Sequence, residues 1–373
     1  MKRKETYANL SWPLYIFLVA ACCLFAKLLF DGLGINTSYD LEMSIYVFDV
    51  LIFVYGIVTC FIVYLLGKAI FSKIAGFNIL YFNLGIIGFK KEKGKFKIYW
   101  GGKENYACKV EIIPNPTKKQ NITLALFGGT ITSLIAVALT FTLVFALNAS
   151  ATMRFFFILS SVFYFLALIG YMLPIRLDNI NDGFRLLLIK KYNLKETYLR
   201  NQRNLEALYN DEKEIEYFDY GDNNDPLSME GKIYNFFYAI RHFEDKELLL
   251  AATKALSRDY KFAVGENFVT IALIAHVYEM CLEERFDELK EFFWKLDTLT
   301  RKTIINKKDL DSIKVGLYIE GKVEDSREGL LELINAVPNC VSKYHFPTQI
   351  DAELKLIDAI KEEIYSSNPD LKL

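Results

Sequence analysis

The chain has 373 residues, of which 53% are hydrophobic, 15% aromatic and 24% charged. This apolar content is higher than that of an average soluble domain, which argues against a purely soluble protein. The 44 Lys and Arg residues nearly cancel the 45 Asp and Glu residues, so no nucleic-acid partner is expected. Only three histidines occur, at His242, His276 and His345, which leaves most of the chain without ligands for a His-based metal site.

Four apolar stretches are long enough to cross a membrane, which takes roughly 20 apolar residues for a hydrocarbon core of about 30 Å. They cover residues 12–30, 44–71, 122–147 and 155–174. The first follows a basic start and lacks a small-residue cleavage site, which favours a retained anchor over a removed signal peptide. We therefore expect a membrane protein with four transmembrane helices, in which residues 1–43 form an N-terminal anchor and an external loop.

The distribution of Lys and Arg between the connecting segments predicts the orientation in the membrane. The N-terminal residues 2–4 and the segment 90–97 are rich in Lys and Arg, whereas the loops 31–43 and 148–153 contain neither residue. Cationic segments stay on the cytoplasmic side. Both termini are therefore predicted to be cytoplasmic.

A small antiparallel β-sheet is predicted between the second and third membrane helices, on the cytoplasmic side. Residues 77–89, 95–100 and 107–113 are rich in aromatic and β-branched residues, with Lys-Gly and Gly-Gly pairs between them. The lysines of this segment have two interpretations. They contact anionic lipid headgroups, or they protect a solvated sheet edge from pairing.

From residue 196 onward the pattern changes to charged and apolar residues with helical period, and no further stretch of membrane length occurs. The expected amphipathic helices cover residues 228–243, 245–260, 266–283, 284–300, 308–319, 326–336 and 349–365. Their pairing resembles helical-hairpin repeats, and residues 315–331 resemble a tetratricopeptide unit without its full pattern. We predict an all-α, tetratricopeptide-like cytoplasmic domain over 196–373 that recruits a cytoplasmic or membrane protein partner.

Near the end of the second apolar stretch the sequence reads YLLGKAIFSKIAGF from Tyr64 onward. This spacing resembles the site-2 family of zinc-dependent intramembrane proteases, whose HExGH core precedes a glycine and a cytoplasmic sheet. Gly67 matches a family glycine. In contrast, Tyr64 stands where the family has its first zinc histidine, Leu65 where it has the catalytic glutamate, and Lys68 where it has the second histidine.

The resemblance continues in order along the chain. An Ile-Pro pair precedes the third apolar stretch, Gly128 lies at its start, and Pro174 and an Asn-Asp-Gly run follow the fourth. Tyr171 stands at a family asparagine position, and Asp182 stands at the position of the third zinc ligand. The resemblance implies that residues 44–195 form an intramembrane-protease-like core with a degenerate site.

The chemistry of these positions argues against catalysis. A catalytic zinc ion needs three protein ligands, an open position for water and a general base. Asp182 is a suitable ligand, but Lys68 would first have to lose its proton, Tyr64 is a rare ligand, and Leu65 accepts no proton. The sequence therefore predicts no catalytic residue, no zinc, no other cofactor and no peptide hydrolysis.

The resemblance also places Lys68 and Asp182 close together, because the family residues at these positions share one zinc ion. We expect an ion pair between them, with Tyr64, one helical turn before Lys68, donating a hydrogen bond. The alternative is that Lys68 extends to the lipid headgroups and that Asp182 caps the short segment 183–191.

The leading functional hypothesis is a non-catalytic, intramembrane-protease-like protein of a bacterial plasma membrane. It would bind or deliver a peptide or membrane segment, in peptide export, maturation or immunity against a peptide. One alternative is an active membrane metallopeptidase with unusual ligands from Cys60, Asn181 and Asp182. Another is an accessory subunit of a transporter, or a structural anchor.

Overall fold

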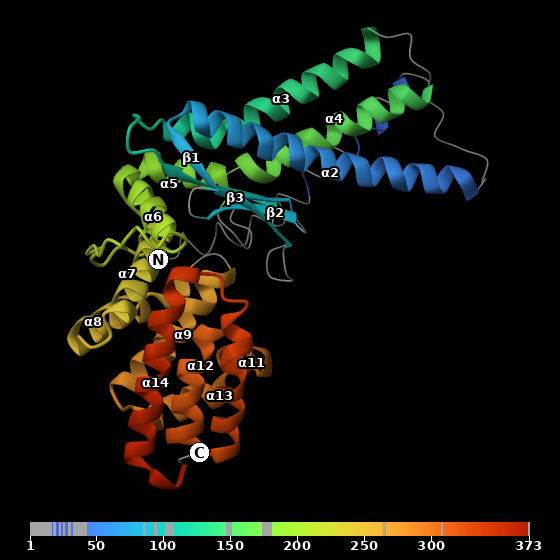
Figure 1. Ribbon diagram of the computed structural model, residues 1–373. Helices are drawn as coiled ribbons and strands as arrows, with labels where there is room; N and C mark the ends of the chain where they lie inside the picture. The colour runs from blue at the N-terminus through green and yellow to red at the C-terminus, as the bar shows by residue number, and fades with distance from the viewer. Residues whose placement is uncertain are drawn as a thin grey trace. The chain divides into compact units, whose positions relative to one another are not determined.

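The computed structural model describes residues 43–84, 87–92, 95–100, 108–146, 151–173, 181–263, 266–306 and 309–371, and isolated helical residues between 17 and 32. The chain divides into two compact units, Met1–Leu194 and Lys195–Leu373 (Figure 1). Most of the predicted first membrane stretch lies outside the described residues, and Pro174 also lies outside them.

Three long apolar helices lie in the first unit. They are α2 (Met43–Ile74), α3 (Ile122–Ala146) and α4 (Ala151–Met172). Among the described residues, Val54–Ile74, Ile122–Ala146 and Met153–Met172 are long and apolar enough to cross a membrane. The helix α2 packs against both α3 and α4, and large apolar side chains such as Val58 and Leu139 are exposed on their outer faces. These faces suit contact with lipid.

Glycines bring α2 and α3 into close contact. A Cβ atom added at Gly129 would lie 2.7 Å from the ring of Tyr64, and one added at Gly67 would lie 1.8 Å from Thr132 Oγ1. The Thr132 hydroxyl bonds the Val63 carbonyl across this contact at 3.2 Å. Small residues stabilise membrane helix pairs in this way because they let the two backbones approach each other.

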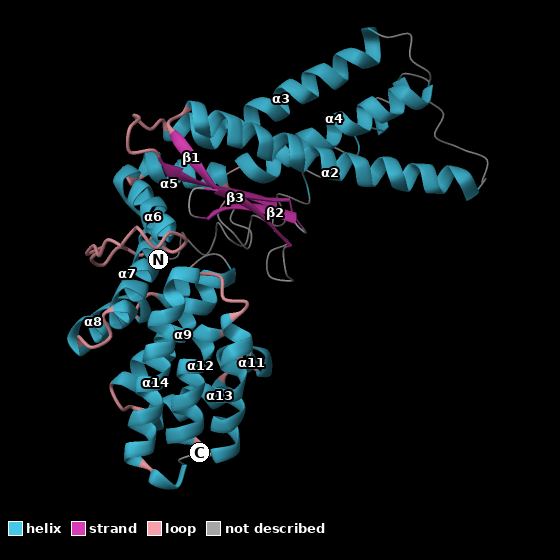
Figure 2. Cartoon of the chain, in the orientation of Figure 1, coloured by secondary structure: helices cyan, strands magenta, loops and turns pink. Residues whose placement is uncertain are grey.

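The predicted antiparallel sheet is confirmed. It contains β1 (Phe77–Leu84), β2 (Ile87–Glu92), β3 (Lys95–Trp100) and β4 (Cys108–Pro114), in the order β3-β2-β1-β4 (Figure 2). The predicted stretch 77–89 forms two strands, β1 and the start of β2, instead of one. Val110, Ile112 and Ile113 of β4 are buried, and α2 contacts both β1 and β4, so these two strands join the core.

The second unit is all-α in its described residues. Its main helices are α6 (Lys195–Ala207), α7 (Pro226–Arg241), α8 (Lys246–Ser257), α9 (Glu266–Leu282), α10 (Phe286–Lys295), α11 (Thr298–Ile304), α12 (Leu310–Tyr318), α13 (Arg327–Val341) and α14 (Ile350–Ser367). The helix expected over 284–300 is two helices, because Asp297 accepts bonds from the amides of Leu299 and Thr300 and starts α11. The sequence reasoning missed α6. The likeness to tetratricopeptide repeats stays a prediction.

The contact at Gly129 generates the first testable prediction. Gly129→Leu should lower the stability of the first unit by about 1–3 kcal/mol, because the leucine side chain would overlap the Tyr64 ring. Thermal unfolding in detergent measures the change. Ala138→Leu adds similar bulk at an exposed position of the same helix and should have little effect. Equal effects of the two substitutions would contradict the packing argument.

Candidate functional site

Three of the four degenerate motif positions meet in one buried contact. Lys68 Nζ lies 2.8 Å from Asp182 Oδ1, and the Tyr64 hydroxyl donates to Asp182 Oδ2 at 3.0 Å. Only 7% of the Lys68 side chain and 5% of the Asp182 side chain are exposed. Leu65, the fourth position, is buried. The Lys68 ammonium and the Tyr64 phenol thus occupy both carboxylate oxygens of Asp182.

Asp182 is positioned by the start of the short helix α5 (Asp182–Lys191). The residue before it, Asn181, caps this helix by accepting from the Phe184 amide at 2.8 Å. The Asn181 amide group also donates to the Gly170 carbonyl of α4 at 2.9 Å. A Cβ atom at Gly183 would lie 1.8 Å from the Met172 carbonyl oxygen, so only glycine permits this approach. Asn181 therefore caps the helix, and Asp182 is left to bond Lys68.

Aromatic rings fill the space beside the ion pair. The ring of Tyr64 stacks on that of Tyr171, with 3.9 Å between centroids and 11° between planes. Gly129 lies against the Tyr64 ring as well. Two positions where the resembled family has a histidine and an asparagine thus hold stacked tyrosines. A closed, aromatic site of this kind leaves Tyr64 fully buried.

A second buried carboxylate lies on the adjacent sheet. Glu111 of β4 is 3% exposed, forms an ion pair with Lys109, and lies 3.9 Å from an Arg185 guanidinium nitrogen of α5. Burial raises the pKa of Glu111, but Lys109, Arg185 and Lys68 outweigh it and hold the pKa at about 2. The sequence reasoning missed Glu111 and Arg185. The signal was a single acid within the otherwise apolar end of β4.

The residues around Asp182 do not fit a zinc ion. In the part of the chain that the structure describes, no three His, Cys, Asp or Glu side chains are placed to hold a metal. The Cys60 thiol donates to the Ile57 carbonyl and packs beside Tyr164. The Asn181 side chain is engaged as the α5 cap. Lys68 pairs with Asp182, and Cys60 and Asn181, the two further ligands of the alternative metal site, are engaged in other contacts.

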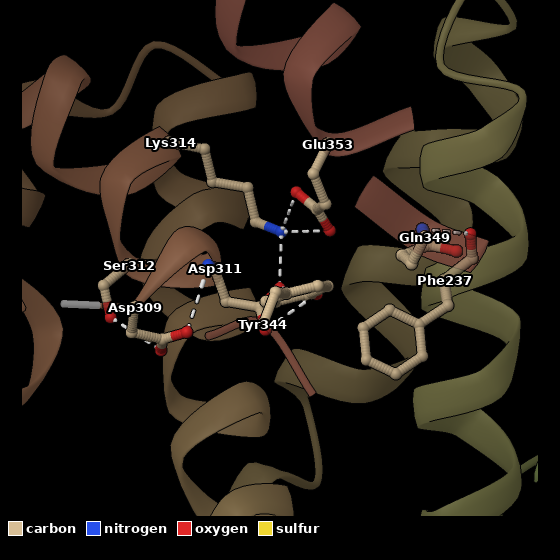
Figure 3. A network of polar contacts seen from close by, with 8 residues as sticks. All are labelled: Phe237, Asp309, Asp311, Ser312, Lys314, Tyr344, Gln349 and Glu353. Atoms are coloured by element: carbon tan, nitrogen blue, oxygen red, sulfur yellow. Dashed lines mark hydrogen bonds and ion pairs between the residues drawn. The ribbon is translucent and has the colours of Figure 1, made fainter. Parts of the chain in front are cut away.

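The second unit contains its own buried charge network (Figure 3). Lys314 of α12 is fully buried, and its Nζ lies 2.9 Å from Glu353 of α14 and 3.1 Å from Asp311. The Tyr344 hydroxyl donates to both Asp311 oxygens at 3.1 Å. Burial raises the pKa of Glu353 to about 8, although the Lys314 ammonium lowers it. One ammonium thus faces two carboxylates, and the network retains a proton near neutral pH.

A serine, a histidine and a glutamate also meet in the second unit. Ser257 Oγ lies 2.7 Å from His276 Nδ1 and donates to Glu279 Oε2 at 2.5 Å. In a nucleophilic triad the histidine bonds both partners, whereas here the serine does. His276 stacks on Tyr260, and burial lowers its pKa. This contact is therefore a helix-packing contact and not a hydrolase site.

Comparison of the chain with protein-family models, with curated protein sequences and with solved structures gives no match.

The ion pair generates the second prediction. Lys68→Met or Asp182→Asn alone should cost about 3–5 kcal/mol, because each leaves a buried partner uncompensated. The double variant should be no worse than either single variant. Thermal stability in detergent measures all three. Small, additive losses would instead describe a solvated lysine that is independent of Asp182.

The Lys314 network generates the third prediction. The pKa of Glu353, about 8 in the folded chain, lies above its unfolded value of 4.5. The bound proton makes its whole contribution to the free energy of unfolding below pH 4.5, and this contribution is lost as the pH rises through about 8. Glu353→Gln should reduce the loss of stability between about pH 6 and 8 by about 2 kcal/mol.

Urea unfolding followed by the fluorescence of Trp294, the tryptophan of the second unit, measures this pH dependence. Glu362→Gln removes an exposed carboxylate from the same helix and is the matched control. The interpretation of the network is wrong if both variants keep the pH dependence of the unsubstituted chain.

Proposed function

We propose that this chain is a non-catalytic membrane protein that holds an extended peptide or membrane segment. The observation that carries the proposal is the buried contact of Tyr64, Lys68 and Asp182. The Lys68 ammonium pairs with the Asp182 carboxylate, so the arrangement of the helices needs no metal ion. Such a site can maintain a binding surface but offers neither an activated water nor a base.

The sheet supports binding of an extended segment. The order β3-β2-β1-β4 puts β3 at an edge, with one neighbouring strand among the strands described. Phe96 and Ile98 of β3 are 55% and 68% exposed, so apolar side chains accompany the backbone of this edge. A peptide that adds to such an edge gains main-chain hydrogen bonds and apolar contacts. This recognition is independent of Tyr64, Lys68 and Asp182.

The membrane placement is part of the proposal. The three described apolar helices and the predicted helix over 12–30 cross a bacterial plasma membrane, with both termini cytoplasmic. The second unit then lies in the cytoplasm and recruits a protein partner. Peptide export, maturation or immunity against a peptide is the setting that we propose for this activity.

Metal content and cross-linking test the proposal together. The purified chain should contain far less than one zinc ion per molecule, and Asp182→Ala should not change that value. A photo-cross-linking residue at Ile98 should capture an added synthetic apolar peptide of strand-forming sequence. A proline-interrupted version of the peptide should be captured poorly, because proline lacks the N–H that strand pairing needs.

A cross-linker at Leu139, on the exposed face of α3, is the matched control and should capture neither peptide. Stoichiometric zinc that is lost in Asp182→Ala would favour the metallopeptidase instead. Equal capture of both peptides at Ile98 would contradict binding by strand addition.

A further inference from the structure

An extended segment of the second unit lies across two helices as a bound peptide would. We call residues 213–220 the strap; they form neither helix nor strand between α6 and α7. Ile215 and Tyr220 near its ends are 2% and 5% exposed, whereas the residues between them are exposed. The side chains of Ile215 and Tyr220 thus anchor the strap, and hydrogen bonds to its backbone provide further contacts.

Two asparagine side chains bond the backbone of the strap. Asn204 of α6 accepts from the Glu216 amide at 2.9 Å and donates to the Glu216 carbonyl at 3.0 Å. Asn235 of α7 accepts from the Phe218 amide at 3.1 Å and donates to the Phe218 carbonyl at 2.6 Å. A side-chain amide matches a peptide group in this way because it carries one acceptor and two donors. The bonded residues, Glu216 and Phe218, are two apart, as expected for an extended chain whose alternate residues face one surface.

The ring of Tyr220 lies in a space between α6 and α7, two residues after the last backbone contact. Two residues after Phe218, the Tyr220 hydroxyl donates to Asn201 Oδ1 of α6 at 3.2 Å. A Cβ atom at Gly231 of α7 would lie 2.1 Å from the Tyr220 ring. The ring therefore fits against α7 only because residue 231 is a glycine. Gly231 and Asn235 are four residues apart and share one face of α7. Ring and backbone are therefore recognised by one continuous surface.

Basic side chains flank this surface. The Arg200 guanidinium lies 3.6 Å from the centroid of the Phe218 ring, and an Arg203 nitrogen lies 3.7 Å from Glu216 Oε2. Cations beside an extended backbone favour ligands that carry aromatic and acidic residues. The strap, whose sequence from Lys213 is KEIEYFDY, has this composition.

We propose that the surface formed by Asn201, Asn204, Gly231 and Asn235 is a peptide-binding groove that the strap covers in the resting chain. Its ligand is an extended segment of a partner protein, with an aliphatic residue five positions before a tyrosine and acidic residues between them. Asn204 and Asn235 bond only backbone atoms of the strap, so the positions between the aliphatic residue and the tyrosine tolerate substitution. This proposal concerns the second unit and is independent of the role proposed for the membrane core.

The strap competes with any added peptide, because its tether gives it an effective concentration of about millimolar. The probe is a fluorescein-labelled synthetic peptide of residues 212–222, added to the full chain in detergent. Ile215→Asp combined with Tyr220→Ser should release the strap without altering the groove. The probe should bind this variant about tenfold or more tightly than the unsubstituted chain.

Substitutions in the groove identify where the probe binds. In the released-strap variant, Asn204→Leu with Asn235→Leu should abolish binding, because each asparagine loses both of its bonds to the peptide backbone. Asn335→Leu, at an exposed position of α13, is the matched control and should leave binding unchanged. Absence of binding to the released-strap variant, or binding that survives loss of both asparagines, overturns the proposal.

Hydrogen exchange on the unsubstituted chain tests the proposal without any variant. Excess unlabelled probe should accelerate exchange at the Glu216 and Phe218 amides, since it captures the groove whenever the strap leaves. The amides within α6 and α7 should stay protected. Strap amides that exchange at the same rate with and without the probe would show that the segment is a fixed part of the fold.

Discussion

The first unit depends on how it accommodates a lysine and an aspartate that are almost completely removed from water. A buried charge without a partner costs several kcal/mol, so the two groups must meet and their remaining bonding capacity must be used. Asp182 therefore bonds both Lys68 and Tyr64. This requirement fixes the start of α5 against α2 and leaves Asn181 to bond the end of α4.

The same constraint extends to the sheet. Glu111 faces Lys109 and Arg185, and its pKa of about 2 keeps it ionised at every physiological pH. Arg185 belongs to the helix that begins with Asp182, so one short helix contributes an anion and a cation to neighbouring contacts. The strand β4, the helix α5 and the helix α2 are thus joined by charges as well as by apolar packing.

The second unit balances its buried charges differently. Lys314 faces the two carboxylates of Asp311 and Glu353, so its single charge balances only one of them. The pKa of Glu353 is raised, and the proton that Glu353 binds balances the second negative charge. The N-terminal part of the second unit buries side-chain amides instead of charges. Asn201, Asn204 and Asn235 are 0%, 0% and 5% exposed. Burying an amide is favourable only where it is bonded, and the strap backbone satisfies two of these three side chains. A surface that is polar yet buried is adapted to a peptide backbone more than to apolar packing.

The sequence by itself determined the three long apolar helices of the first unit, the small sheet and most helices of the second unit, because hydrophobic patterns and turn residues are local signals. The meeting of Lys68 with Asp182 was expected from the order of the motifs, but its distances and its burial follow only from the packing of α2, α4 and α5. Glu111, Arg185 and the strap could not be identified in advance. Their partners lie on other elements, and neither a single glutamate in a strand nor three asparagines in two helices specifies what they bond until the chain has folded.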